Sequence, residues 1–335
     1  MIRVARTALL PAAIVEFERG QRMANATTRR DVLKGSLAMA GLSVVGLPEW
    51  AIPALAQGET LMEFTDLPDE INLIRDAERR IIDVRHIDGP ITPTGQFFTT
   101  QHYGHPNVDT ATYRLRVSGL VDEPLTLSVA DLRAMPSREL VFGFECSGNR
   151  GPLNGLSSNG RWTGVPLRTV LERAGIQDDA REFVFFGADH GEEEVEFRGR
   201  TYNVDQQYGR SLERDQALSD EPLLAYALNG EPLTAHQGRP LRLLVPGWYG
   251  APNVKFLSEI HVQKDQYLGK YQARWYRTLK GEMVNGDMKW KETAISTMRI
   301  KSFIARVTST GSAHNIFGVV MHDGTPLQSV EVMID

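Results

Sequence analysis

The sequence predicts a mixed α+β fold that ends in short strands typical of a β-sandwich. Segments of alternating polarity indicate strands, helical segments are few and short, and the two do not alternate as in a parallel βαβ sheet. From about Lys291 onward only short strands and turns follow. A sandwich of this kind needs about 100 residues. We therefore expect the sequence to be a fragment that stops within this second domain.

The N-terminal segment predicts export. The adjacent Arg29 and Arg30 precede an apolar stretch, residues 37–47, and a small-x-small cleavage site ends at Ala56. This pattern is typical of a signal peptide, and the paired arginines are typical of the twin-arginine type, which exports folded proteins. The apolar stretch is short for a membrane span. We expect residues 1–56 to be a twin-arginine-type signal peptide and the mature protein to be periplasmic.

Composition narrows the classes of partner. The formal net charge of −5 argues against nucleic acid and anionic lipid. A single cysteine, Cys146, excludes an internal disulfide framework. An exported protein with one thiol buries it, uses it or commits it to a metal. Nothing recognisable precedes Met23, which we expect to be the true start.

The first part of the mature chain is rich in Gly and Pro and predicts loops, with one helix of mixed charge at 69–80. Residues 113–121 alternate and predict a strand. Residues 128–135 predict a short helix, because a serine can cap its start and Pro136 ends it. Residues 162–175 predict a second helix, with a proline near its first turn and a glycine at its end.

The remainder is predicted to be mostly strand, because short apolar runs are bounded by turn residues. Asn229-Gly230 is a hairpin signal, and Asp323-Gly324 marks a further turn. The predicted strands are 182–186, 194–197, 223–228, 241–247, 255–262, 300–307, 315–321 and 330–334.

Cys146 stands out because of its surroundings. A short apolar segment of strand character precedes it, and Gly148, Asn149 and Gly151 follow, which tolerate positive φ and let the backbone approach a ligand. Most free cysteines are buried and have no chemical role. The polar, glycine-flanked loop and the export signal favour a functional thiol here.

Five segments carry a family resemblance: Cys-Ser-Gly-Asn-Arg at 146–150, Trp-Thr-Gly-Val-Pro-Leu at 162–167, Leu-Ala-Tyr-Ala-Leu-Asn-Gly at 224–230, Leu-Leu-Val-Pro-Gly-Trp-Tyr-Gly at 243–250 and Asn-Val-Lys-Phe-Leu at 253–257. In this order they resemble the sulfite oxidase family of molybdopterin-dependent oxidoreductases. The resemblance implies a sulfite oxidase-type molybdopterin-binding domain at 57–288. It also implies an immunoglobulin-like dimerisation domain that begins at 289–335 and is incomplete.

The resemblance also implies roles for particular residues. Cys146 would be the thiolate ligand of molybdenum, which suits a soft metal centre. Arg242 and Lys255 would bind the pterin and its phosphate, since a buried phosphate requires fixed cations. Tyr276 and Arg150 would orient the substrate. The remaining implied cofactor-binding residues are His102, Asp189, Gln237, Asn253 and Val254.

Three positions depart from the family pattern. Thr100 and Gly151 stand where many sulfite-oxidising members carry arginines, and this weakens the case for a sulfite dianion. Gln237 aligns with a cofactor-contacting histidine, and His236 beside it is a candidate to replace that histidine.

The leading functional prediction is oxidation of sulfite to sulfate by Mo-molybdopterin, with electrons passed to a separate c-type cytochrome and a homodimer or heterodimer in the complete protein. The alternative that reverses the chemistry is an S-oxide reductase, acting for example on methionine sulfoxide. A metal-free cysteine hydrolase with Cys146 as nucleophile and an inactive cofactor-binding module are the alternatives from other classes.

Overall fold

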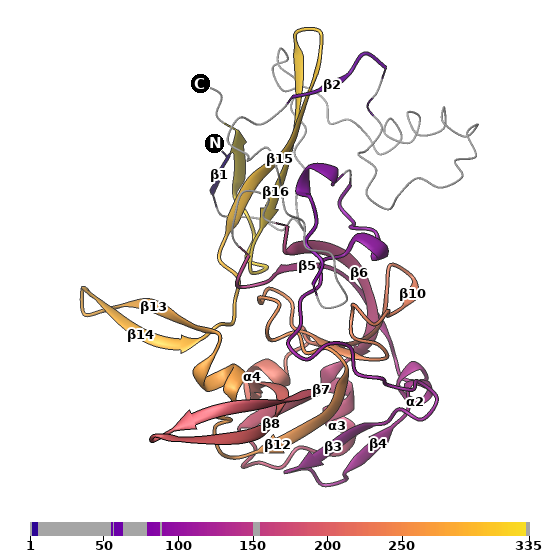
Figure 1. Cartoon of the computed structure of the whole chain (residues 1–335), viewed down its shortest axis with the longest axis vertical. Coiled ribbons are helices and arrows are strands. Elements are labelled where there is room, and N and C mark those ends of the chain that lie inside the picture. Colours follow the sequence, from indigo (N-terminus) through magenta and orange to yellow (C-terminus); the bar gives the residue numbers. More distant parts are fainter. Residues whose placement is uncertain are drawn as a thin grey trace.

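Figure 1 shows the computed structural model of the chain, which describes residues 2–5, 55, 57–62, 79–87, 89–149 and 155–332. The described part is built mostly of strands. The predicted signal peptide and the predicted helix at 69–80 lie almost wholly outside the described residues. Within them, no helix combines the length and hydrophobicity that crossing a bilayer requires.

The first sheet carries the thiol loop at the end of one of its edge strands. All its neighbouring strands are antiparallel, in the order β10-β9-β6-β5, and β11 also pairs with β9. Its strands are β5 (Arg138–Glu145), β6 (Ser157–Pro166), β9 (Leu223–Leu228), β10 (Glu231–Pro232) and β11 (Arg242–Leu244).

The second sheet lies at the bottom of the view in Figure 1. Its order is β4-β3-β12-β7-β8, and only the pairing of β12 with β3 is parallel. Its strands are β3 (Leu115–Gly119), β4 (Leu125–Leu127), β7 (Glu182–Phe197), β8 (Arg200–Glu213) and β12 (Leu257–Gln263).

Helix α3 (Leu167–Ala174) connects the cores of the two sheets. Its buried Val170 and Leu171 share one apolar cluster with Val165 of the first sheet and Phe183 of the second. Burial of such side chains contributes about 1.5–3 kcal/mol each, so this cluster fixes the sheets relative to each other. The other short helices are α2 (Val129–Arg133), α4 (Arg214–Ala217), the 3₁₀ turns η2 (Val84–His86) and η3 (Thr94–Gln96), and the π-helical turn η4 (Lys270–Arg274).

A C-terminal β unit packs on the first sheet. It contains β15 (Lys301–Thr310) and β16 (Ala313–Met321), to which β2 (Thr60–Leu61) adds a third strand, and the pair β1 (Ile2–Ala5) and β17 (Ser329–Val332). A second apolar cluster joins it to the thiol-bearing strand, because Phe317 and Met321 share that cluster with Phe144.

A separate hairpin projects from the body at the left of Figure 1. It is formed by β13 (Arg277–Val284) and β14 (Asp287–Ala294), joined at Asn285 and Gly286, both with positive φ. Residues opposite each other on paired strands share a face. One face of this hairpin is therefore apolar and exposed, formed by Leu279, Met283, Met288 and Trp290.

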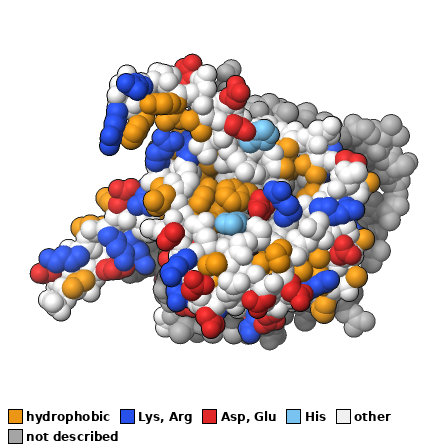
Figure 2. Space-filling view, turned by 90° about the horizontal axis from the view of Figure 1, so that it is seen from below, with side chains coloured by type: hydrophobic (Ala, Val, Ile, Leu, Met, Phe, Trp, Pro, Cys, Tyr) orange, Lys and Arg blue, Asp and Glu red, His pale blue; other side chains and the backbone are white. Residues whose placement is uncertain are grey.

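The charge on the lower face is mixed. In Figure 2, which looks at the molecule from below, basic and acidic side chains are interspersed, with apolar side chains and a histidine gathered near the centre. No large region of one sign dominates the described residues on this face.

Most predicted elements in the described part are confirmed, with shifted boundaries. The capping serine of the first helix is confirmed: Ser128 accepts from the Asp131 backbone in a full capping box. The helix predicted at 162–175 is wrong in its first part, because Trp162 to Pro166 belong to β6. Trp162 is fully buried and its Nε1 donates to the Phe142 carbonyl at 3.1 Å, so pairing within the sheet prevails over local helix propensity.

Candidate functional site

Most predicted site residues in the described part line one pocket. Cys146, which follows β5, reaches it from the first sheet, and Asp189 of β7 reaches it from the second. Loops and other strands supply the rest of the lining, with Arg242 from β11 and Tyr208 from β8. The lining includes His102, Arg242, Asn253, Lys255 and Tyr276 together with Phe98, Thr99, Thr100, Gln101, Phe144, Tyr208, His236, Gly250 and Ala251.

The Cys146 turn is fixed by the backbone on both sides. Cys146 N donates to the Leu156 carbonyl at 2.9 Å, and Asn149 N donates to the Cys146 carbonyl at 2.8 Å. Burial raises the pKa of the thiol above its ordinary value. A thiol with such a pKa is a poor free nucleophile at neutral pH, whereas a metal would deprotonate it outright.

A buried arginine and a half-buried lysine face the pocket, and their hydrogen bonds go to backbone carbonyls and neutral side chains. Arg242 Nη1 and Nη2 donate to the carbonyls of Gln237 (3.1 Å) and Asn253 (3.0 Å). Lys255 Nζ donates to Thr99 Oγ1 (3.0 Å) and to Gln101 Oε1 (2.8 Å). Burial lowers the pKa of Arg242 to about 9 and that of Lys255 to about 7. Removing these positive charges from water destabilises the folded protein unless an anion occupies the pocket.

Three further polar atoms in the pocket wall are buried without a hydrogen-bond partner: Arg242 Nε, Asp189 Oδ1 and His236 Nδ1. Buried polar atoms are nearly always hydrogen-bonded in folded proteins. Burial raises the pKa of Asp189 to about 6 and lowers that of His236 to about 4. The pocket is therefore prepared for a ligand that offers both hydrogen-bond donors and acceptors.

A histidine and a phenol form a pair at the pocket wall. His102 Nε2 and the Tyr276 hydroxyl lie 2.7 Å apart. Burial lowers the pKa of His102 to about 4 and raises that of Tyr276, so both side chains are neutral at pH 7. Tyr276 has φ 54, a strained value for a non-glycine residue that is common at functional sites. A neutral pair of this kind can donate to a substrate oxygen without adding charge.

The structure places the other predicted residues as follows. Asn253 is buried, and its side chain accepts from Val245 N and donates to the Tyr249 carbonyl. Val254 is fully buried behind the pocket. Gln237 is buried as well, but its neighbour His236 lines the pocket instead. Arg150 lies outside the described residues.

The sequence analysis missed Tyr208, which lines the pocket and whose hydroxyl donates to the Ala251 carbonyl at 2.8 Å. The Tyr208 ring stacks against His102, with centroids 5.7 Å apart, and so fixes the orientation of that histidine. No motif surrounds Tyr208, and its position becomes clear only once β8 pairs with β7.

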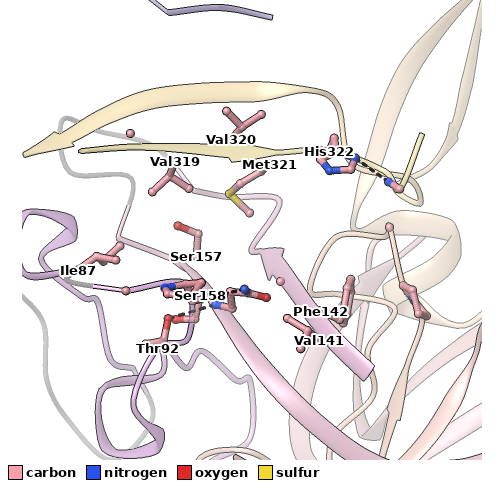
Figure 3. A pocket seen from close by; sticks show the side chains of 18 of the residues that line it. Ile87, Thr92, Val141, Phe142, Ser157, Ser158, Val319, Val320, Met321 and His322 are labelled. Atoms are coloured by element: carbon pink, nitrogen blue, oxygen red, sulfur yellow. Dashed lines mark hydrogen bonds between the residues drawn. The ribbon is translucent and has the colours of Figure 1, made fainter. Parts of the chain in front are cut away.

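A larger cavity of about 360 Å³ lies elsewhere, between β5, β6 and β16. Figure 3 shows its apolar lining, with Ile87 and Phe142 on one side and Val319 and Met321 on the other. None of the predicted site residues lines it. Its chemistry is that of an apolar gap and not of a polar site.

The comparisons with known proteins agree with this geometry. The family model described as oxidoreductase molybdopterin binding domain matches residues 102–271. Mouse mitochondrial sulfite oxidase is 34% identical over 60% of this chain and 39% of its own length. The NADH nitrate reductase of Ulva prolifera is 31% identical over 56% of this chain and 22% of its own length. This chain thus spans less than half the length of these curated relatives.

The fold has a solved counterpart as well. The sulfane dehydrogenase SoxCD from Paracoccus pantotrophus superposes with a TM-score of 0.57 and 21% identity, covering 84% of this chain and 82% of that one. The chain belongs to the sulfite oxidase family of molybdopterin-dependent oxidoreductases, and its cofactor is Mo-molybdopterin.

The residues present fit this cofactor. Arg242 and Lys255 supply the fixed cations that a phosphate tail requires, and the unpartnered Asp189 Oδ1 and His236 Nδ1 suit the polar edge of a pterin. In the described part of the chain, no three His, Cys, Asp or Glu side chains gather as a metal site of their own. Cys146 provides a soft thiolate at the pocket wall.

Proposed function

We propose that this molybdopterin-dependent oxidoreductase oxidises sulfite to sulfate and passes the electrons to a c-type cytochrome. One observation carries the proposal: the only thiol of the chain shares a pocket with two cationic side chains, Arg242 and Lys255, and a neutral His–Tyr pair. The curated relatives named sulfite oxidase support the substrate, and a structural neighbour named sulfane dehydrogenase is consistent with a sulfur substrate. When bound, the cofactor supplies two-electron oxygen-atom exchange.

Each residue in the pocket has a defined task in this proposal. Cys146 binds the metal as a thiolate. Arg242 and Lys255 hold the phosphate tail, and Asp189, His236 and the buried Asn253 segment hold the pterin. Tyr276 donates a hydrogen bond to a substrate oxygen, while His102 keeps the phenol in place at 2.7 Å.

Arg150 and Tyr276 together orient the anionic substrate in this proposal. Arg150 follows Cys146 by four positions in the sequence, and a guanidinium suits a planar or pyramidal oxyanion through bidentate donation.

A second candidate function is reduction of a neutral S-oxide such as methionine sulfoxide. A specific observation favours it: Thr100, with no charge, lines the pocket where many sulfite-oxidising members carry arginine. A neutral sulfoxide needs less positive charge around it than a sulfite dianion does. Arg242 and Lys255 do not decide between the substrates, because both are proposed to bind the cofactor.

The sequence also supports proposals about export, domain bounds and assembly. We propose that residues 1–56 direct twin-arginine export, that 57–288 form the molybdopterin-binding domain and that the protein acts in the periplasm. The β unit at 289–335 is proposed to begin an immunoglobulin-like dimerisation domain, in a complete protein that forms a homodimer or a heterodimer with its cytochrome.

The test compares two assays on exported, full-length protein with measured molybdenum content. We expect stoichiometric molybdenum and sulfite-dependent reduction of cytochrome c, with little reduction of methionine sulfoxide by a dithionite-reduced dye. Turnover of sulfoxide without turnover of sulfite would establish the second candidate instead. A protein without molybdenum that hydrolyses esters would overturn both.

A further inference from the structure

The residue before the thiol is a buried carboxylate. The side chain of Glu145 is 5% exposed, and its Oε2 accepts from Lys301 Nζ at 3.0 Å. Lys301 begins β15, in the C-terminal β unit and not in the molybdopterin-binding domain. A buried carboxylate requires such a cation, and removing it leaves the charge uncompensated.

The same carboxylate oxygen fixes the Cys146 turn. Asn149 Nδ2 donates to Glu145 Oε2 at 2.8 Å, and Leu156 N donates to Asn149 Oδ1 at 3.0 Å. Asn149 N in turn donates to the Cys146 carbonyl at 2.8 Å. Glu145 and Asn149 therefore fix the turn on both sides of Cys146, and Lys301 fixes the carboxylate of Glu145.

A second connection reaches the same turn through the backbone. Ser296 and Met298, just before β15, pair with Tyr249 and Gly247, at 2.9 and 2.8 Å. Gly250 N then donates to the Glu145 carbonyl at 2.7 Å. A Cβ at position 250 would lie 3.3 Å from that carbonyl oxygen, so the two segments are tightly packed here. The C-terminal unit is in contact with the thiol turn by two independent routes.

We propose that Lys301 is a positioning residue for Cys146, acting through Glu145, so that the C-terminal β unit sets the orientation of the thiol. This rests on Cys146 as the metal ligand proposed above and is independent of which sulfur substrate is used. Groups that orient a metal ligand from behind commonly change metal affinity by about 10- to 100-fold when removed.

The chain has one cysteine, so alkylation reports this thiol alone. In molybdenum-loaded, full-length protein, we expect Lys301→Met to raise the rate of N-ethylmaleimide labelling and to lower retained molybdenum, each by about 10-fold. Lys301→Arg keeps the cation and should restore both values. Lys291→Met is the matched control, because Lys291 pairs with Glu282 at 2.8 Å on the exposed hairpin.

A double variant tests whether Lys301 acts through Glu145. Glu145→Gln removes the charge that Lys301 compensates while it keeps an acceptor for Asn149. The Glu145→Gln, Lys301→Met protein should therefore label close to the wild-type rate, with unchanged circular dichroism. Labelling as fast as in the single Lys301→Met variant overturns the proposal. So does a folded Lys301→Met protein that labels like wild type.

The two proposals fail in different ways. If Cys146 of the wild-type protein is labelled as fast as in the unfolded chain although molybdenum is bound, Cys146 is not the metal ligand. Both proposals are then wrong. Protected wild-type Cys146 with no effect of Lys301→Met ends only the positioning role. The sulfite and sulfoxide assays do not enter either outcome.

Discussion

Tyr276 combines three unusual properties: a strained backbone, a half-buried phenol and a 2.7 Å contact with a neutral histidine. Such a group is held in place before any substrate arrives. Its neighbour Trp275 is 49% exposed, yet its ring lies edge-on to that of His102, with centroids 5.7 Å apart. The two consecutive aromatic residues therefore both contact His102.

We expect Tyr276→Phe to lower kcat/KM by about 100-fold, because one preorganised donor to a reacting oxygen is lost. Molybdenum content should not change, since the ring still packs beside His102. Tyr202→Phe, in the exposed first half of β8, is the control and should keep full activity. An unchanged kcat/KM for Tyr276→Phe would show that the phenol does not touch the substrate.

Lys255 is expected to destabilise the cofactor-free protein and to stabilise the protein that holds the cofactor phosphate. Burial depresses its folded-state pKa to about 7, below the ordinary 10.5, so the unfolded chain binds more protons between these values. The stability of the cofactor-free protein should therefore rise as the pH increases from about 7 to about 10. A bound phosphate removes this dependence by keeping Lys255 charged.

Lys255→Met should accordingly raise the melting temperature of cofactor-free protein at pH 7 and flatten its pH dependence, while it lowers molybdenum content. Thermal unfolding of both forms across this pH range measures the effect. Lys264→Met, at an exposed pair with Asp179 at 3.8 Å, is the control. A cofactor-free Lys255→Met protein that is less stable than wild type would contradict the prediction.

Strand β6 explains why one of the sequence predictions was wrong. Residues 162–166 have a helix-like signature before Leu167, yet Gly164 lies against the Leu224 carbonyl of β9, where a Cβ would come within 2.2 Å. The approach of the two strands requires glycine at this position. Information about that neighbour is absent from the local sequence.

Gly164→Ala should destabilise the fold by about 1–3 kcal/mol, because backbone atoms of β9 must shift. Denaturant unfolding measures the change. Gly89→Ala is a suitable control, since nothing lies within 4 Å of a Cβ there, and its stability should match wild type. Equal stability of the two variants would show that β9 moves freely.

The projecting hairpin was also missed, although its Asn285-Gly286 turn was readable in the sequence. Its strands alternate apolar and charged residues, as strands with one polar face do. By contrast, the Leu223–Leu228 strand and its Asn229-Gly230 turn were predicted correctly, because both local signals agree there.

Across the whole molecule, the sequence was more informative about the site than about the fold. Motifs at Cys146, Arg242 and Lys255 identified residues that line one pocket. Tyr208 was not predicted, and the sequence left open whether Gln237 or His236 faces the pocket, since both depend on which side chain turns inward. The link from Lys301 to Glu145 joins distant segments and leaves no local pattern.

The hairpin of β13 and β14 has one further consequence. Among the residues that the structure describes, no strand pairs with either outer edge of this two-stranded ribbon, and such edges favour addition of a strand from another molecule and growth into fibres. Lys280, Lys289 and Lys291 place charge along this ribbon, which discourages that growth. Concentrated protein should therefore stay dispersed at low salt, even though the hairpin exposes Trp290 and its apolar neighbours.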